Sequence, residues 1–189
     1  MAAQYVLGID LGTTNSVLSY SRLDGEKPTI ELLPVPQLTA PGTVENRTGL
    51  PSFVYLATEA EAKASAYDLP GPSGRDFAVG EVARRQSAEL PQRTISQAKS
   101  WLCHNRVDRH HKILPWNAPA DVPKISPVTA SRRFLEHLVA TWEQAHPEAP
   151  AIDQLVVLTV PASFDASARE LTREAALAVV ITPEEVREV

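Results

Sequence analysis

The 189-residue sequence contains one cysteine, no long apolar run and no excess of positive charge. A single cysteine excludes an internal disulfide framework and favours a reducing compartment. No segment has the roughly 18 consecutive apolar residues of a transmembrane helix, and the start of the chain lacks the basic segment of a signal peptide. The net charge of -5 argues against nucleic-acid binding, which usually requires a basic surface. We therefore expect a soluble, cytoplasmic protein with no nucleic-acid or membrane partner.

Proline is the residue in excess, with 16 in the chain against a usual share of about 5%. Five of these prolines lie from Pro28 to Pro51, and they predict a long extended connection that is unsuited to helix. Residues 57–76 are rich in alanine, proline, glycine and serine and predict a surface loop. The composition of residues 107–123 indicates no clear element.

Short apolar runs predict strands at residues 5–11, 16–21, 29–33 and 53–56. The first three have short connections and suggest a meander at the start of an α/β domain. The run at residues 155–160 is mostly apolar, so a strand formed by it would have apolar side chains on both faces. It predicts a parallel strand covered on both faces.

The clearest predicted helix covers residues 127–145. Ser126 is a suitable N-cap, and Pro127 suits the first helical position. One face of this helix carries an apolar stripe, formed by Val128, Leu135, Leu138, Val139 and Trp142. Further helices are expected at residues 81–90 and 95–102, and Asp165 is a candidate cap for a helix to about residue 178. The order of elements predicts the α/β class.

The strongest local motif is Gly-Ile-Asp-Leu-Gly-Thr-Thr-Asn-Ser at residues 8–16. A buried strand ends near the carboxylate of Asp10, and Gly12 then allows a backbone to approach a phosphate closely. Thr13 and Thr14 add hydroxyl donors, and Asp10 could hold magnesium directly or through water. No lysine stands where a Walker-type loop needs one. The same residues also suit a tight hairpin, so the motif alone leaves both interpretations open.

A second segment, Leu-Thr-Val-Pro-Ala-Ser-Phe-Asp at residues 158–165, resembles the Val-Pro-Ala-aromatic-Phe segment of the 70-kilodalton heat-shock protein family. With the opening motif, which resembles that family's phosphate-binding hairpin, it has the family's order and distance. Three further stretches fit the same register, at residues 50–54, 79–86 and 98–102. The resemblance covers the chain to about residue 178.

The resemblance implies the first lobe of an actin-like, ribonuclease H-like ATPase fold. This lobe would have a mixed sheet with packed helices and a smaller inserted subdomain. Residues 1–40 and 126–189 would form its lower subdomain, and residues 41–125 its upper subdomain.

The resemblance also implies ATP or ADP and magnesium as cofactors. Asp10 would orient magnesium-bound water and act in catalysis. Gly12, Thr13, Thr14 and Asn15 would contact the nucleotide phosphates, although the family often carries an aromatic residue where Asn15 stands.

Three residues outside the hairpin match functional positions of the family. Arg84 falls where the family usually carries the lysine that positions the attacking water, which makes it a catalytic candidate. Arginine keeps the positive charge of lysine, but its guanidinium is a planar fork and not a compact point charge. Alternatively, Arg84 is an exposed helix residue. Pro161 and Arg169 match the family's interdomain switch, although Pro161 could simply end a strand and Arg169 could face solvent.

Other candidate residues have simpler explanations. Four residues could be considered as metal ligands but are expected to be solvated loop residues, because no zinc-site spacing supports them: Cys103, His104, His110 and His111. A basic patch is expected on the surface of the upper subdomain: Lys99, Arg106, Arg109 and Lys112. The tryptophans are expected to be buried or half-buried anchors: Trp101, Trp116 and Trp142.

Later landmarks of the family do not follow in this sequence, including its glutamate segment, second phosphate loop, adenosine-binding motif and peptide-binding domain. We therefore expect an N-terminal fragment of a chaperone ATPase. In the full-length protein, hydrolysis would drive binding and release of unfolded polypeptide, with co-chaperones as partners. The isolated chain is expected to bind ATP weakly or not at all and to be inactive. The alternatives are a non-catalytic binding module and an actin-superfamily sugar kinase.

Overall fold

The computed structural model describes residues 2–25, 27–69, 74–104, 106–160, 164–180 and 186–188. Its largest sheet has the order β11-β10-β1-β2-β3, with β6 also paired to β2. The strands of this sheet are β1 (Tyr5–Leu11), β2 (Asn15–Arg22), β3 (Glu31–Leu32), β6 (Leu50–Pro51), β10 (Leu155–Thr159) and β11 (Val186–Glu188). β1 runs parallel to β10 but antiparallel to β2. The sheet is therefore mixed and the fold is α/β, as predicted.

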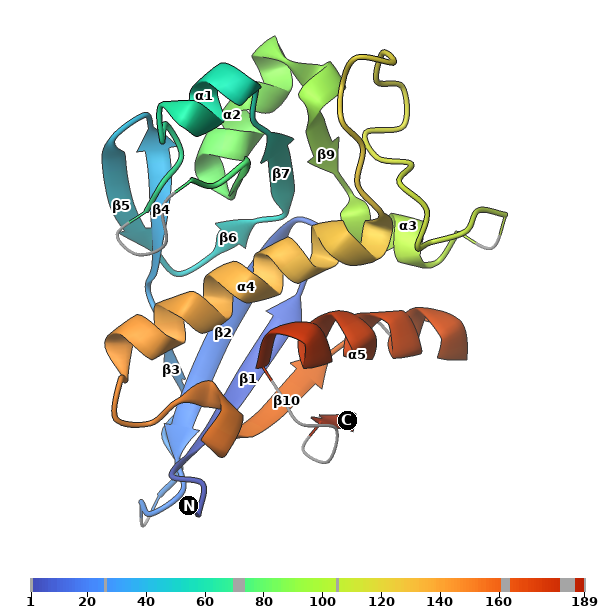
Figure 1. Cartoon of the computed structure of the whole chain (residues 1–189). Coiled ribbons are helices and arrows are strands. Elements are labelled where there is room, and N and C mark those ends of the chain that lie inside the picture. Colours follow the sequence, from blue (N-terminus) through green and yellow to red (C-terminus); the bar gives the residue numbers. More distant parts are fainter. Residues whose placement is uncertain are drawn as a thin grey trace.

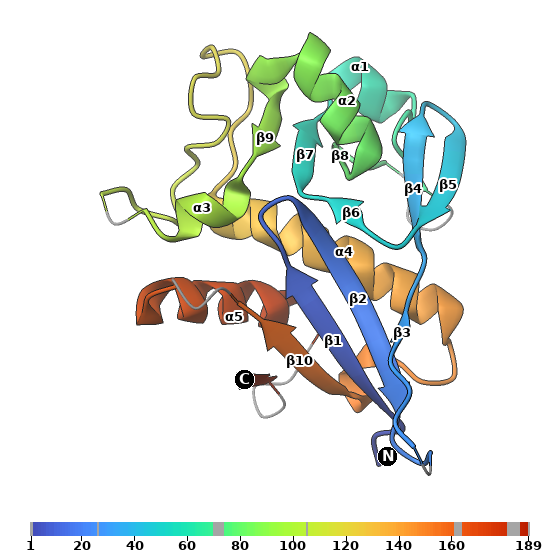
Figure 2. The same ribbon diagram turned by 180° about the vertical axis from the view of Figure 1, so that it is seen from behind.

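Two helices, α4 (Pro127–Ala145) and α5 (Ala166–Val180), cover one face of this sheet (Figures 1 and 2). Ser126 caps α4 as predicted, because its hydroxyl accepts a hydrogen bond from Thr129 N at 3.0 Å. The predicted stripe of α4 is buried, and Trp142 donates a hydrogen bond to Ala149 O at 2.8 Å. Asp165 accepts a hydrogen bond from Ala168 N at 2.7 Å, so the predicted start of α5 is also confirmed.

The prediction that residues 155–160 form a strand covered on both faces is wrong. Val156 and Leu158 of β10 are buried, whereas Leu155 is 38% exposed and Thr159 is exposed. Figure 2 shows the reason, since the helices of the described chain lie behind the strands and none lies in front of them. The strand therefore buries alternate side chains only.

A second region lies above the large sheet in Figure 1. Its three-stranded sheet has the order β8-β7-β9 and consists of β8 (Phe77–Val79), β7 (Phe53–Leu56) and β9 (Thr94–Ser96). A separate two-stranded sheet pairs β4 (Val35–Ala40) with β5 (Thr43–Arg47). The helices of this region are α1 (Glu59–Lys63), α2 (Glu81–Glu89) and α3 (Ala98–Leu102). Short 3-10 turns cover Pro91–Arg93 in this region and Ala151–Asp153 before β10.

Several predicted segments differ from the structure. The proline-rich connection contains the β4–β5 hairpin, whose turn includes Gly42 at a φ of 73°. The predicted loop 57–76 contains α1, which begins with a capping box between Thr58 and Glu61. The predicted helix 95–102 begins as β9 and becomes helical only after Gln97, because Ile95 pairs with Val54 in the sheet.

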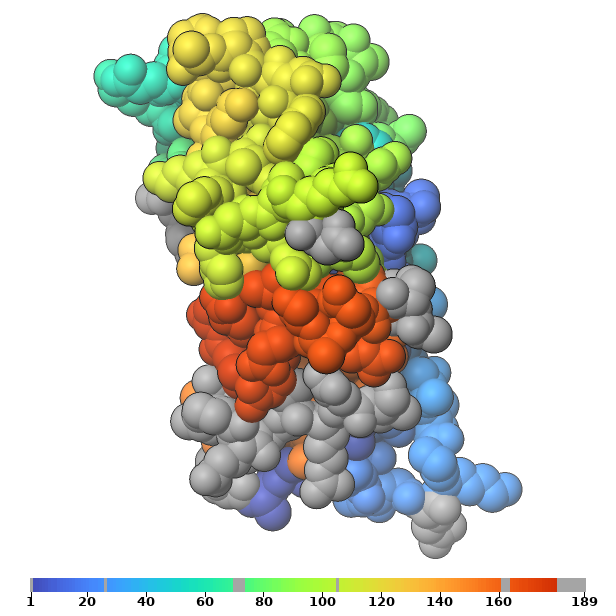
Figure 3. All heavy atoms as spheres, turned by 90° about the vertical axis from the view of Figure 1, so that its right-hand side faces the viewer, coloured from blue at the N-terminus to red at the C-terminus, as the bar shows by residue number. Residues whose placement is uncertain are grey.

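The two regions are joined by buried contacts. His137 of α4 is 4% exposed, and its Nε2 lies 2.8 Å from Pro36 O of β4. One hydrophobic cluster extends from the large sheet and α4 to Val54 and Phe77 of the upper region. Seen from the side, the segment that follows α3 lies directly on α5 (Figure 3), where His110 pairs with Glu174 at 3.6 Å.

Two further observations concern the expected subdomain boundary at residue 40 and membrane-spanning helices. β4 ends at Ala40 and pairs with β5, so the expected boundary between residues 40 and 41 falls inside the β4–β5 hairpin. None of the described helices is both long and apolar enough to cross a membrane.

Candidate functional site

The candidate site is the turn between β1 and β2, residues 12–15, which we call the β1–β2 turn. Leu11 pairs with Ser16, so the chain reverses within these four residues. A Cβ atom on Gly12 would lie 2.0 Å from Asn15 O, a distance that no side chain tolerates. Glycine is therefore required here by the hairpin itself, whether or not a ligand binds.

Ser52 anchors the β1–β2 turn through two hydrogen bonds. Its hydroxyl donates to Gly12 O at 2.7 Å, and its backbone N–H donates to Thr14 O at 2.9 Å. The Ser52 side chain also lies 3.3 Å from the hydroxyl of Ser16, and both serines are buried. Sequence analysis assigned Ser52 no role, although it lies in the resembling stretch 50–54. Its function depends on the pairing of β6 with β2, which the sequence pattern did not predict.

The polar side chains of the β1–β2 turn face outward. Thr13, Thr14 and Asn15 are exposed, and within the described part of the chain none of their side chains has a hydrogen-bond partner. Two hydroxyls and one amide are therefore free to bind a ligand. Hydroxyl and amide donors around a tight turn are suited to anionic oxygens.

Asp10 lies next to the turn at the end of β1, with its side chain exposed. The parallel pairing of β1 with β10 brings Thr159 beside it, and the Thr159 hydroxyl donates to Asp10 Oδ1 at 3.0 Å. This bond holds one carboxylate oxygen, and among the described residues Oδ2 has no hydrogen-bond partner. Sequence analysis did not identify Thr159, because only the strand register shows this contact.

The described residues contain no group of three or more histidine, cysteine or carboxylate side chains that could hold a metal. The histidines of this loop are exposed: His110 lies 3.6 Å from Glu174, and His111 lies 3.3 Å from Asp108. The surroundings of Asp10 accordingly fit magnesium only as an ion that keeps most of its waters and uses one carboxylate. They do not fit a metal held by protein ligands alone.

Lys99 is buried, which corrects the prediction of a surface basic patch. It is 9% exposed, and with Gly12, Ser16 and Ser52 it lines a small cavity beneath the β1–β2 turn. Its ammonium nitrogen lies 5.5 Å from the centroid of the Phe164 ring. Burial lowers the pKa of Lys99, and the negative charge of Asp10 opposes this shift.

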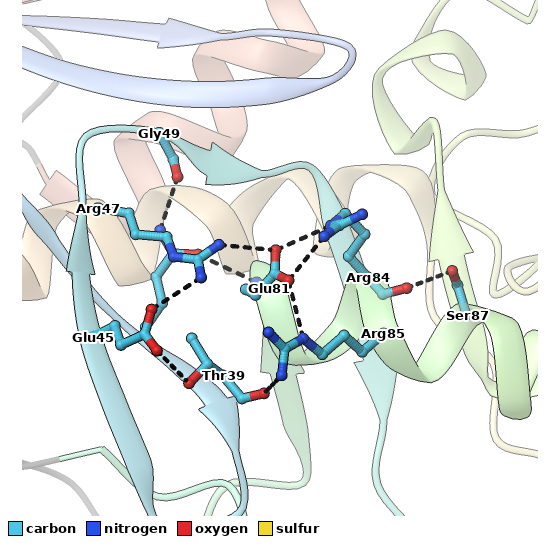
Figure 4. A network of polar contacts seen from close by, with 9 residues as sticks. Thr39, Glu45, Arg47, Gly49, Glu81, Arg84, Arg85 and Ser87 are labelled. Carbon is cyan, nitrogen blue, oxygen red and sulfur yellow. Dashed lines mark hydrogen bonds and ion pairs between the residues drawn. The ribbon is translucent and has the colours of Figure 1, made fainter.

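Arg84 lies on α2 and is held by a buried carboxylate (Figure 4). Its Nε and Nη2 donate to the two oxygens of Glu81 at 3.0 and 2.8 Å. Arg85 and Arg47 also pair with Glu81, at 3.0 and 3.3 Å, and the Glu81 side chain is only 3% exposed. We call these four residues the Glu81 cluster.

The Glu81 cluster has two consequences for Arg84. Hydrogen bonds from Arg84 above all lower the pKa of Glu81, so the carboxylate remains charged. Among the described residues, Glu81 is the acidic partner of the Arg84 guanidinium, and no contact joins that guanidinium to Asp10 or to the β1–β2 turn. Sequence analysis did not identify Glu81, although its position three residues before Arg84 on a helix is a spacing typical of ion pairs.

The two residues matched to an interdomain switch have different outcomes. Pro161 lies outside the described residues. Arg169 is half-buried on α5, where its Nε donates to Phe164 O at 3.2 Å. Arg169 therefore anchors the residue that precedes the cap of α5, and a switch function stays a prediction.

Comparison with known proteins gives one informative result. No family model matches the chain. The chaperone protein DnaK of Stenotrophomonas maltophilia (strain R551-3) is 29% identical over 179 residues, which represent 90% of this chain and 24% of DnaK. This chain is distantly similar to a chaperone. It spans about a quarter of the length of that relative, and the similarity agrees with the resemblance carried by the motifs.

Proposed function

We propose that the chain is the N-terminal part of an ATPase domain of a 70-kilodalton heat-shock-type chaperone, and that its β1–β2 turn binds the phosphates of ATP or ADP. The observation that carries this proposal is that, among the described residues, the side chains of Thr13, Thr14 and Asn15 have no hydrogen-bond partner. They stand on a turn that Ser52 holds by two hydrogen bonds. A preorganised turn with free donors binds an anion without first having to become ordered.

Asp10 is proposed to bind a magnesium ion through water, beside the phosphates. Magnesium, when bound, would neutralise part of the phosphate charge. Asp10 is exposed and its Oδ2 would be available for this contact, while Thr159 donates a hydrogen bond to Oδ1. Because Gly12 has no side chain, the phosphates could approach the backbone of the turn closely.

The proposed architecture is the first lobe of an actin-like ATPase fold. Residues 1–40 and 126–189 would be its lower subdomain, and residues 41–125 its upper subdomain. The mixed sheet covered by α4 and α5, with a second region above it, is compatible with this arrangement. Pro161 and Arg169 would belong to a switch that relays nucleotide state.

The activity of the whole protein is a further part of the proposal. DnaK is a chaperone protein of which this chain covers 24%, so coupling of ATP hydrolysis to the binding and release of unfolded polypeptide would need the remaining domains. Co-chaperones would act on that complete protein. The isolated chain is expected to bind nucleotide weakly and to show no significant turnover, because an active site between two lobes needs both of them.

A second candidate function is a non-catalytic binding module. It is favoured by Arg84, whose guanidinium is engaged by Glu81 and would have to leave a buried carboxylate to position water. Distant similarity to DnaK supports a chaperone ATPase over a sugar kinase. Peptide-stimulated ATP hydrolysis by the complete protein would separate the first two candidates, and phosphorylation of a sugar would support the third.

The phosphate-binding proposal is tested by titrating magnesium-ADP into the chain at millimolar concentrations, with amide chemical shifts as the readout. We expect the shifts to be largest at Thr13 and Thr14, and Thr13→Val to weaken binding about tenfold through the lost hydroxyl. The matched control is Thr29→Val, which changes an exposed threonine outside the turn. Equal affinities for the two variants, or shifts confined to other parts of the chain, would contradict the proposal.

A further inference from the structure

A pocket in the upper region is separate from the β1–β2 turn. It lies between residues 91–97, which include β9, and the segment after α3, which runs beside β9 in both Figures 1 and 2. Its volume is about 430 Å³, a size typical of small-molecule sites. Within the described part of the chain, tryptophan, proline, amide and hydroxyl residues line this pocket and no charged side chain does. The pocket therefore suits an uncharged ligand.

Two tryptophans form an aromatic wall of this pocket. The ring centroids of Trp101 and Trp116 are 4.8 Å apart at an interplanar angle of 26°, so the two indoles are stacked. His104 also stacks on Trp101, whereas Trp116 is 50% exposed. Trp142, by contrast, is fully buried and donates to Ala149 O. Water in contact with an apolar ring is unfavourable, so a ligand that covered Trp116 would be stabilised there.

Amide side chains surround the aromatic wall. Gln92, Gln97 and Asn117 line the pocket, and none of their side chains has a hydrogen-bond partner among the described residues. A carboxamide offers both a donor and an acceptor. The pocket can therefore donate hydrogen bonds to a ligand and accept hydrogen bonds from it, next to an apolar ring.

Gln97 has a backbone conformation that glutamine does not favour. Its φ of 59° and ψ of 29° lie in the left-handed region, which residues other than glycine rarely adopt. Gln97 precedes α3, yet its side chain makes no capping hydrogen bond to that helix. Neither the backbone nor the helix thus explains a glutamine at this position. Strained residues of this kind are common at binding sites, where the side chain itself is needed.

The segment that carries Trp116 is held in place. Leu114 and Ile125 exchange two backbone hydrogen bonds, at 3.0 and 2.8 Å, which close the segment between them. Within it, the ammonium group of Lys124 donates to Trp116 O at 3.3 Å. The pocket therefore exists before a ligand binds, and little free energy is lost to ordering.

We propose that this pocket binds an uncharged saccharide, with the exposed indole of Trp116 stacked on a sugar ring. A pyranose ring has a face of C–H groups, which matches the apolar indole, and a rim of hydroxyl groups. Each hydroxyl both donates and accepts, as the amides of Gln92, Gln97 and Asn117 do. The inference concerns a different site from the β1–β2 turn and does not depend on nucleotide binding.

Two other ligand classes fit this geometry less well. A nucleobase is commonly held between two aromatic or apolar side chains, with both of its faces covered. A proline-rich peptide docks into a groove lined by aromatic rings. Because Trp101 and Trp116 stack on each other at 4.8 Å, no slot is left between them for either ligand. A single exposed indole beside amide groups suits a ligand with one apolar face and a polar rim.

The direct test titrates uncharged trisaccharides into the unmodified chain at millimolar concentrations. The probes are maltotriose, cellotriose and triacetylchitotriose, and the readout is the indole N–H signals in a proton–nitrogen correlation spectrum. The chain has only three tryptophans, so each signal can be assigned by substitution. We expect at least one probe to shift the Trp116 signal with a Kd in the millimolar range or below. The signal of Trp142 should not move, because that indole is buried and bonded to Ala149 O.

Adenosine and a proline-rich peptide are the comparison ligands, titrated at the same concentrations. A larger response of Trp116 to a saccharide than to either comparison ligand supports the inference. An equal or larger response to a comparison ligand would overturn it, as would the absence of any shift with all three saccharides. A shift of Trp142 as large as that of Trp116 would also overturn it, since binding would then not be confined to the pocket.

Substitutions at Trp116 test the stacking contact. Trp116→Ala should weaken saccharide binding at least about tenfold, and Trp116→Phe, which keeps a smaller ring, about threefold. Ile30→Ala is the control, because it removes another large apolar side chain, 77% exposed, outside the pocket. Equal affinities for Trp116→Ala and Ile30→Ala would contradict the inference. The titration of the unmodified chain keeps the inference testable even if Trp116→Ala folds poorly.

Gln97→Gly is expected to affect binding and stability differently. Glycine adopts the left-handed conformation without strain, so the melting temperature should stay the same or rise. Loss of the amide should nevertheless weaken saccharide binding about threefold to tenfold. Ser65→Gly is the matched control, because Ser65 also has a positive φ, 52°, but does not line the pocket. Equal affinities for these two glycine variants would contradict the inference.

Discussion

The β1–β2 turn and the Glu81 cluster are both polar regions, but they differ in how their polar groups are satisfied. In the cluster, three arginines share one carboxylate, and Arg85 also donates to Thr39 O at 2.6 Å (Figure 4). On the turn, the outward side chains have no partner within the described chain. The comparison suggests that the cluster holds the upper region together, while the turn keeps its donors for a ligand.

Burial explains the difference. The carboxylate of Glu81 is almost inaccessible to water and must be compensated inside the protein. The threonines of the turn are exposed, so water satisfies them at no cost until a ligand replaces it. Lys99 is the exception, because it is buried like Glu81 but has no hydrogen-bond or ion-pair partner among the described residues.

The largest expected effect is the pH dependence of stability that His137 causes. This residue connects α4, which packs on the large sheet, to β4 of the upper region. Burial above all lowers its pKa from 6.5 to about 4, with the charge of Arg75 contributing, while the bond to Pro36 O opposes the shift. The neutral ring donates from Nε2 to that carbonyl. The unfolded chain therefore binds a proton at higher pH than the folded chain does. Stability is full above pH 6.5 and should fall by about 3 kcal/mol as the pH drops to about 4.

Urea unfolding at a series of pH values measures this dependence. His137→Gln keeps a hydrogen-bond donor but cannot titrate, so the slope between pH 6.5 and pH 4 should decrease strongly. His104→Gln, at an exposed position, should leave the slope unchanged. An unaltered slope in His137→Gln would mean that other groups control the acid sensitivity.

The next effect tests the Glu81 cluster itself. Glu81→Gln removes the charge that three arginines share, although those arginines remain partly accessible to water. We expect unfolding free energy to fall by about 2 kcal/mol, with no loss of phosphate affinity beyond the effect of instability. Glu45→Gln is the matched control, because Glu45 pairs with Arg47 at 2.9 Å but is half exposed; its effect should remain below about 0.5 kcal/mol.

A smaller effect is expected where Thr159 orients Asp10. Thr159→Val removes the hydrogen bond to Asp10 Oδ1 and should weaken magnesium-ADP binding about threefold to tenfold, measured by calorimetry. Its melting temperature should remain close to that of the unmodified chain, since Thr159 is exposed. Thr43→Val, on the exposed strand β5, controls for a threonine-to-valine change. Equal binding by the two variants would show that the Asp10 orientation does not matter.

The smallest effect is expected for the stability of Arg84→Met. Arg47 and Arg85 remain on Glu81 in this variant, so the loss should be less than about 1 kcal/mol by urea unfolding. Arg85→Met is the natural comparison, because it also breaks the bond to Thr39 O. A greater loss for Arg84→Met than for Arg85→Met would mean that the bond from Arg85 to Thr39 O adds little to stability.

Elements with strong local signals were predictable from the sequence. The strand Tyr5–Leu11 and the helix Pro127–Ala145 have the predicted boundaries, because an apolar run before a glycine and a capped amphipathic stripe are local patterns. The β4–β5 hairpin and β9 were missed. Their formation depends on pairing with distant partners, as Ile95 does with Val54.

The candidate site was predictable in part. The motif identified Asp10 and the residues of the turn, because glycine and hydroxyl side chains next to a buried strand indicate their chemistry. The motif could not identify Ser52 or Thr159. Ser52 lies 40 residues from Gly12, and Thr159 lies 149 residues from Asp10, the residues to which they donate hydrogen bonds. Their contribution comes from strand register rather than from residue type.

By itself, the sequence determined the α/β class, the turn chemistry of residues 12–15 and a resemblance to a chaperone family, because each is encoded in short patterns. Only the tertiary structure decided which charges are free. It buried Lys99 beneath the turn, with no ion-pair partner in the part of the chain that the structure describes, and it paired Arg84 with Glu81. The physical reason is that the effect of a charge depends on its burial and neighbours, and folding alone brings α3, α2 and the turn together.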